Sequence, residues 1–183
     1  MLRYCNLIIS IFCLFVLVSC AKTESHDLRL YQSCLQGVTQ NRLLLKVPLG
    51  KDVKHELNAC VDGNTELLIR RLRNVEVKYI EISHQDQNLV TEGELESKKS
   101  DPSVKLYGVI VMTLHDSDKS IFREWIQMPN PSNRVFITLD NEVRSMFILT
   151  NNISKEQLQL DIGEDLSLID PTFSALKTLI VSD

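Results

Sequence analysis

The chain divides into three zones by its pattern of apolar and polar residues. A short hydrophobic stretch, Leu7–Val18, lies near the N-terminus, and a small polar stretch, residues 21–26, follows it. From Asn41 onward, short apolar runs alternate with clusters of turn-forming residues. Because Gly, Pro, Asn and Asp punctuate these runs at short intervals, the third zone predicts a protein built from sheets.

The apolar runs of the third zone have the composition and period of strands. They are Leu43–Val47, Leu67–Ile69, Val75–Ile82, Leu106–Leu114, Val135–Leu139 and Met146–Thr150. Val75, Val77 and Tyr79 alternate with Glu76 and Lys78, which is typical of a strand with one face in solvent. We therefore expect a mainly β fold, an antiparallel β-sandwich over residues 42–183.

The connections carry more specific expectations. Phe122–Met128 is interpreted as the antiparallel partner of Leu106–Leu114, joined to it by a charged hairpin turn at His115–Ser120. Residues 84–103 are polar and predict an exposed loop. Ser154 begins a capping-box pattern before a short segment. Asp170 and Pro171 have the order of an N-cap and a first helical residue, so a short C-terminal helix is expected over residues 171–180.

The N-terminal run resembles the signal peptide of a bacterial lipoprotein. Arg3 provides a positive start, the apolar run follows, and Leu17-Val18-Ser19-Cys20 matches a lipobox. The run is shorter than the ~20 apolar residues that a membrane-spanning helix needs. A plain secretory signal would end in an alanine-type cleavage site rather than at Cys20. The resemblance implies that Cys20 becomes the first mature residue and carries several acyl chains, including palmitate-type chains. Such chains anchor the protein to lipid.

The lipoprotein interpretation divides the chain into three segments. Residues 1–19 are the signal peptide, 20–41 the lipidated N-terminus and tether, and 42–183 the periplasmic domain. Fully extended, about 20 tether residues would reach roughly 70 Å. Residues 27–38 are ambiguous, since their apolar positions also follow a helical spacing. Ala21 follows Cys20 in place of the aspartate that typically retains lipoproteins in the inner membrane. By analogy this favours the outer membrane, with the domain facing the periplasm.

Composition and charge narrow the function further. The full chain has a formal net charge of −4, which becomes −5 when residues 1–19, with Arg3 as their one charge, are removed. A mildly acidic chain without a basic aromatic stripe does not indicate nucleic-acid binding. The mature chain keeps Cys34 and Cys60 besides the anchor. In an oxidising compartment they are a possible disulfide, and two separate buried thiols are the alternative.

The sequence contains no pattern that predicts catalysis. The four histidines, His26, His55, His84 and His115, form no HxH or HExxH motif and no paired cysteine spacing, so no metal site is expected. There is also no GxSxG elbow, CxxC motif or glycine-rich phosphate loop. We therefore expect neither an enzyme nor a bound cofactor.

Two features suit binding or packing instead. Arg70, Arg71 and Arg73 cluster beside one predicted strand and could meet an acidic partner, although such charges also protect exposed strand ends. Trp125, the only tryptophan, is expected to pack in the core, with an interface anchor as the alternative.

The segment from Arg42 to Arg73 resembles the start of the type VI secretion outer-membrane lipoprotein family, TssJ. The matching features are the strand Leu43–Val47, the Leu57-Asn58 step, the Asp62-Gly63 turn and the arginine-containing strand that ends in Arg70-Arg71-Leu72. Arg134–Leu149 is similar to the family's later pair of strands.

The resemblance implies a transthyretin-like β-sandwich below the outer membrane that docks a periplasmic secretion-system protein without catalysis. It makes residues 50–64 the loop for partner contact. The candidate partner-binding residues are Leu57, Asn58, Asp62, Gly63, Arg70 and Arg71.

Two other functions stay open on the sequence. A carrier or assembly lipoprotein for lipid or for an outer-membrane protein, similar to LptE, would need an apolar groove or a plug-like insertion. A cell-wall enzyme would need polar residues that converge in a cleft.

Replacement of Cys20 by alanine tests the anchor directly. The thiol is the only acceptor for the acyl chains at that position, so Cys20→Ala should abolish acyl labelling and release the protein from tight membrane association. Metabolic labelling with an acyl probe and membrane fractionation measure both. A variant that stays membrane-bound, or a wild-type chain without acyl label, would show that the lipoprotein assignment is wrong.

Overall fold

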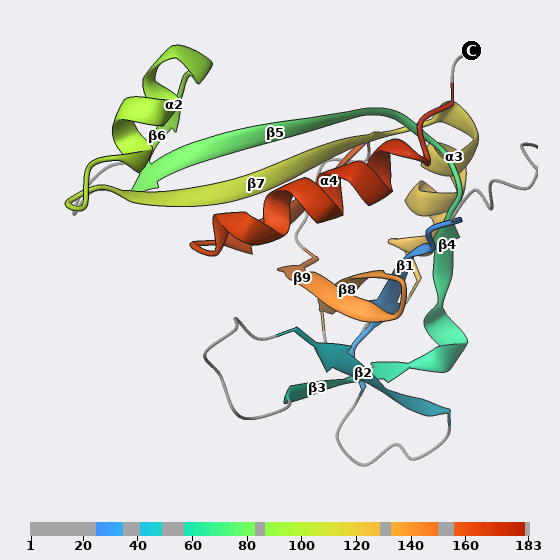
Figure 1. The fold of residues 1–183 in the computed structure, drawn as a ribbon. Helices are drawn as coiled ribbons and strands as arrows, with labels where there is room; N and C mark the ends of the chain where they lie inside the picture. The colour runs from blue at the N-terminus through green and yellow to red at the C-terminus, as the bar shows by residue number, and fades with distance from the viewer. Residues whose placement is uncertain are drawn as a thin grey trace, which may run out of the picture.

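Two β-sheets form most of the fold (Figure 1). The computed structural model describes residues 25–34, 41–48, 57–82, 87–128, 133–149 and 156–181. Sheet A has six strands in the order β3-β2-β9-β8-β1-β4, and sheet B has four in the order β10-β7-β5-β6. Every pair in these sheets is antiparallel except β2 with β9. The expected mainly β, sandwich-like fold is therefore confirmed.

The bounds of the strands and helices follow the chain in order. The strands are β1 (Leu28–Gln32), β2 (Arg42–Val47), β3 (Leu57–Asp62), β4 (Leu67–Ile69), β5 (Leu72–Ile82), β6 (Gln87–Val90), β7 (Lys105–Leu114), β8 (Arg134–Leu139), β9 (Glu142–Ile148) and β10 (Gln157–Gly163). The helices are η1 (Gly63–Thr65), α2 (Glu92–Lys99), α3 (Asp116–Trp125), η2 (Leu166–Leu168) and α4 (Ile169–Lys177).

The main hydrophobic core lies between the two sheets. Alternate residues of β7, namely Ile110, Met112 and Leu114, are fully buried and pack in one cluster with residues of β1 and β8. Because successive side chains of a strand point to opposite faces, Leu28 and Leu30 of β1 join this core. Tyr31, the next residue of the strand, points to the opposite face and belongs to a second cluster.

Sheet A curls until its edge strand β3 meets the end of β1, the strand next to the opposite edge. Ser33, directly after β1, forms a bridge with Val61 of β3, and the Cys34 N–H donates to the Cys60 carbonyl at 3.1 Å. A disulfide joins Cys34 and Cys60 at the same place, with their Cα atoms 5.5 Å apart. The curl encloses the second cluster, which consists of Tyr31, Leu45, Ala59, Val61 and Val143. The disulfide thus closes the seam between β1 and β3.

Helix α4 packs closely on sheet B because Gly108 has no side chain at the point of contact. A Cβ atom on Gly108 of β7 would lie 2.3 Å from Cδ1 of Ile169 at the start of α4. Without that atom the buried Ile169 side chain sits directly on the strand. Figure 1 shows α4 lying along β5 and β7.

The predicted tether is too long. Residues 20–41 are not all a linker, because Leu28–Gln32 forms β1, hydrogen-bonded to β4 on one side and β8 on the other. The domain therefore begins before residue 42. Leu28 and Tyr31 also fit a helical spacing, because they lie on opposite faces of a strand that is buried on both sides.

The predicted strand Phe122–Met128 is wrong. Residues 116–125 form helix α3, which the His115 side chain caps by accepting from the Ser117 N–H, so His115–Ser120 is not a hairpin turn. Asp118, Phe122 and Trp125 are the buried residues of this helix and follow a helical spacing. The partners of β7 are β5 and β10 instead.

Three smaller expectations also need correction. Within residues 84–103, which were expected to be a loop, Gln87–Val90 forms β6 and Glu92–Lys99 forms α2 with a capping box at Thr91. Ser154 lies outside the described residues, and the segment from Gln157 is strand β10 rather than helix. The C-terminal helix exists but begins at Ile169, so Asp170 and Pro171 lie inside its first turn rather than at the cap.

Loss of the disulfide should destabilise the domain substantially. Cys34 and Cys60 are 26 residues apart in sequence, and a link over a loop of that size contributes about 3.5 kcal/mol by restricting the unfolded chain. The double variant Cys34→Ser/Cys60→Ser should therefore lose roughly 10 °C in Tm. Calorimetry with and without dithiothreitol measures this. Reduction should lower the Tm of the wild type to that of the variant and leave the variant unchanged; equal Tm values for oxidised wild type and variant would contradict the role.

Candidate functional site: an apolar groove and two exposed surfaces

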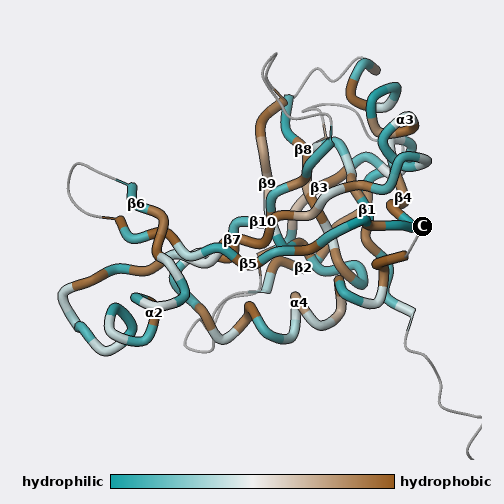
Figure 2. Tube along the Cα trace, turned by 90° about the horizontal axis from the view of Figure 1, so that it is seen from above, coloured by the Kyte–Doolittle hydropathy of each residue, from teal (hydrophilic) through white to brown (hydrophobic). Residues whose placement is uncertain are grey.

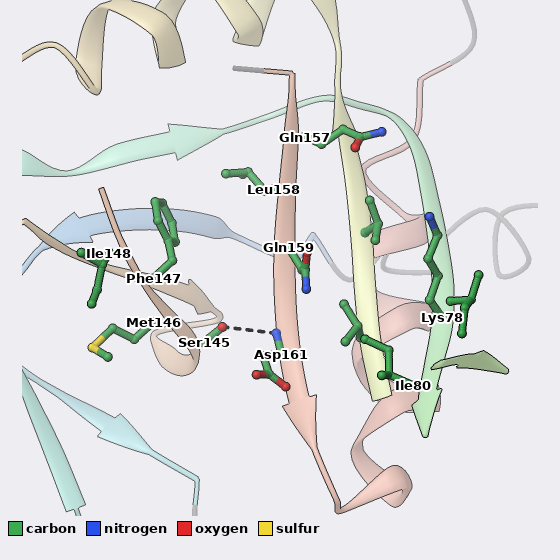
Figure 3. A pocket seen from close by; sticks show the side chains of 13 residues that line it. Lys78, Ile80, Ser145, Met146, Phe147, Ile148, Gln157, Leu158, Gln159 and Asp161 are labelled. Carbon is green, nitrogen blue, oxygen red and sulfur yellow. Dashed lines mark hydrogen bonds between the residues drawn. The ribbon is translucent and has the colours of Figure 1, made fainter. Parts of the chain in front are cut away.

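A groove of about 510 Å³ runs between sheet B and residues 145–148 at the end of β9 (Figure 3). Its floor is the face of sheet B that points away from the main core. Register places Lys78 opposite Val109, and Ile80 opposite Leu89, on this face. The lining residues are Lys78, Ile80, Leu89, Val109, Val111, Ser145, Met146, Phe147, Ile148, Gln157, Leu158, Gln159 and Asp161.

The groove combines an apolar floor with a polar rim. Leu89 is 64% exposed, and Met146 and Ile148 are also exposed, so three large apolar side chains reach solvent around one hollow. Lys78, Gln159 and Asp161 supply polar groups beside them. The Asp161 N–H donates to Oγ of Ser145 at 3.2 Å, which holds β10 against β9 at the base of the wall (Figure 3). Exposed apolar side chains gathered in this way mark a binding surface.

The candidate partner-binding residues of β3 separate into an exposed end and a structural end. Leu57 is 56% exposed and Asn58 is exposed, both at the start of the strand. At its other end, the Asp62 side chain accepts from the Asn64 N–H and caps η1. A Cβ on Gly63 would lie 3.1 Å from the Asn41 carbonyl oxygen. Asp62 and Gly63 therefore shape the turn, and residues 50–56 of the predicted docking loop lie outside the described residues.

Arg70 and Arg71 lie apart from that exposed end, in the turn between β4 and β5. Both side chains are exposed. The Arg70 N–H donates to Oδ1 of the buried Asp118 at 3.0 Å, and the Arg71 carbonyl accepts from the His115 N–H at 3.2 Å. Arg73 differs, because its guanidinium lies 3.0 Å from Asp116. The structure does not unite the six candidate residues into one site.

The start of the domain is fixed by a small polar cluster that sequence reasoning missed. His26 lies 2.7 Å from Oδ2 of Asp140, and the Asp27 N–H donates to Oδ1 of the same carboxyl at 3.0 Å. Burial favours a higher pKa for Asp140, but the Asp27 N–H and His26 outweigh it and hold the pKa below its ordinary value. Asp140 and Asn141 both have positive φ, the signature of a tight hairpin between β8 and β9.

The remaining candidate residues have structural positions. Trp125 is buried, and its Nε1–H donates to the Thr65 carbonyl at 2.9 Å, so the core interpretation is confirmed. Of the histidines, His26 contacts Asp140 and His115 caps α3. His55 and His84 lie outside the described residues. Within the described ranges, no three His, Cys, Asp or Glu side chains gather in a way that could hold a metal ion.

Comparison with known proteins does not assign the chain to a family. The chain matches no protein-family model, no curated protein and no solved structure. Among the helices in the described part of the chain, none has the length and apolar content to cross a membrane. What the surfaces can do is therefore inferred from their own chemistry.

Proposed function

We propose that this chain is a lipid-anchored docking protein of the periplasm, a non-catalytic component of a transenvelope secretion system of the type VI kind. Acylated Cys20 would anchor it in the outer membrane, and the folded domain would present a surface to a periplasmic secretion-system protein. The proposal combines the signal-peptide pattern that ends at Cys20 with the resemblance of residues 42–73 to TssJ.

The disulfide supports a compartment outside the cytosol. Cys34 and Cys60 are bonded at the seam of sheet A, where they contribute to the fold itself. Structural disulfides form and persist in oxidising compartments such as the bacterial periplasm and are rare in the cytosol. The bond is consistent with an export signal at the N-terminus.

The observation that carries the docking proposal is the exposure of leucines on the β2–β3 pair. Leu57 is 56% exposed and Leu43 is exposed beside the η1 turn, and the register of the pair places both side chains on one face. Leu44, which is 69% exposed, points to the opposite face, so Leu43 and Leu57 form the candidate docking surface. Leu57 belongs to the segment that the resemblance marks for partner contact. Apolar side chains that stay in solvent on an edge pair of strands are suited to a protein partner that buries them.

Site-specific photocrosslinking tests this surface. A benzoylphenylalanine placed at Leu57 should crosslink in cells to one inner-membrane secretion protein, because the side chain would be buried in that contact. The matched control is the same probe at Leu89, which is comparably exposed on the other sheet. A specific product from Leu57 and none from Leu89 supports the proposal. Products from neither position, or an outer-membrane protein captured at Leu57, would contradict it.

The groove on sheet B favours a second function, a carrier of lipid between the membranes. Its volume of about 510 Å³ lies within the range of small-molecule sites, and its floor and wall are largely apolar. An acyl chain could lie against Val109 and Val111 while a polar headgroup meets Lys78 or the glutamines of the rim. This use of the molecule needs no protein partner at Leu57.

Lipid that copurifies with the protein distinguishes the two functions. A carrier should retain lipid detectable by mass spectrometry after mild extraction, and Leu89→Lys/Met146→Lys should lower the retained amount at least tenfold by charging the exposed groove wall. Leu44→Lys is the control, since Leu44 is exposed outside the groove. Circular dichroism checks that each variant folds. Absence of lipid from the wild type, or equal loss in the Leu44 variant, would exclude the carrier function.

A further inference from the structure

The N-terminal segment enters the folded domain beside two arginines. Leu28, the first residue of β1, pairs directly with Ile69, the last residue of β4, and Arg70 and Arg71 follow at once. Leu28 follows Cys20 by only eight positions, so the attachment point lies at most about 28 Å from the start of the sheet. The tether is therefore short, and the end of the domain that carries Arg70 and Arg71 is the end held closest to Cys20.

Both guanidinium groups are exposed, and neither makes a hydrogen bond or ion pair with a residue in the described ranges. The acidic groups nearby are already engaged. Asp116 binds Arg73 and Lys119, and the buried Asp118 accepts from the Arg70 backbone and the Ser117 hydroxyl. Asp27 likewise contacts Arg29 at 2.8 Å. Arg70 and Arg71 are therefore available at this end to meet an external anion.

The backbone beneath these arginines is held on both sides. The Arg70 N–H and the Arg71 carbonyl are bonded to α3, as described above, and the Leu72 N–H donates to the Leu179 carbonyl at 2.9 Å. The Val181 N–H donates back to the Leu72 carbonyl at 3.1 Å. The turn therefore presents its two charges from a fixed position rather than from a mobile loop.

We propose that Arg70 and Arg71 bind the anionic lipid headgroups of the membrane in which Cys20 is anchored, and so set the orientation of the domain. This inference rests on the proposed attachment at Cys20. A chain with net charge −5 is repelled as a whole by an anionic surface, so the face with free cations turns toward it. A basic pair next to the acyl anchor adds an electrostatic attraction to anionic headgroups on one side of the domain.

The orientation that follows places the groove away from the membrane. β5 begins at Leu72, next to Arg71, and Ile80 in the groove lies eight residues farther, about 26 Å along the strand. Figure 2 shows β6 and α2 at the opposite end of the molecule from β1, β4 and the C-terminus. Sheet B would then extend its far end into the periplasm.

Chemical attachment at Cys20 tests the inference without relying on acylation in the cell. The mature chain, beginning at Cys20 and with Cys34 and Cys60 oxidised, is coupled through its free thiol to maleimide lipid. The vesicles contain either phosphatidylcholine alone or 30% phosphatidylglycerol. Phenylglyoxal modification of each arginine is then followed by mass spectrometry. Arg70 and Arg71 should react at least fivefold more slowly on the anionic vesicles, with the rate restored in 0.5 M NaCl, while Arg42 on β2 reacts equally on both.

A matched pair of variants gives an independent measure. In the soluble Cys20→Ala form, Arg70→Gln/Arg71→Gln should weaken co-sedimentation with anionic vesicles at low salt by about 30-fold, the factor expected from two arginines at roughly 1 kcal/mol each. Lys99→Gln/Lys105→Gln removes the same charge from α2 and β7, outside the groove, and should change the co-sedimentation less than threefold. Equal modification rates on the two vesicle types, or equal effects of the two double variants, would overturn the inference. Missing acyl label on Cys20 in cells would instead refute the proposed anchor.

Discussion

The position of β1 is the constraint on which the rest of the structure depends. This short strand is hydrogen-bonded to β4 and to β8, and its buried leucines enter the main core. Its last residues turn sheet A back on itself through the Ser33 bridge and the Cys34–Cys60 disulfide. Without β1, the strands on its two sides would each lose a partner, and the second core cluster around Tyr31 would open.

The same strand couples the fold to the membrane in the function that we propose. Because β1 begins so soon after Cys20, a chain anchored there has little freedom to move its domain away from the lipid. The contacts of Asp140 with His26 and Asp27 fix the first residues of the domain to the β8–β9 hairpin. A long flexible stalk would average over all orientations, whereas a short attachment lets a few surface charges select one.

The two candidate surfaces lie on different sheets and suit different occupants. The β2–β3 pair presents separate exposed leucines, which a protein surface could cover. The groove on sheet B instead gathers apolar residues around one open hollow with polar groups at the rim, which suits a chain-like ligand. The division arises because sheet A uses one face for each core cluster, while sheet B is covered by α4 on one face only.

Local patterns in the sequence determined the strands with clear apolar runs and the turn at Asp62-Gly63, because turn chemistry and side-chain alternation act over a few residues. The buried spacing of Asp118, Phe122 and Trp125 was also present in the sequence as a helical signal, but apolar content outweighed it in the strand interpretation. Tertiary structure alone decided that β1 is a strand, that Cys34 meets Cys60, and that Arg70 lies beside the start of the domain. Each of these depends on pairing between segments distant in the chain, and no local pattern encodes which strands become neighbours.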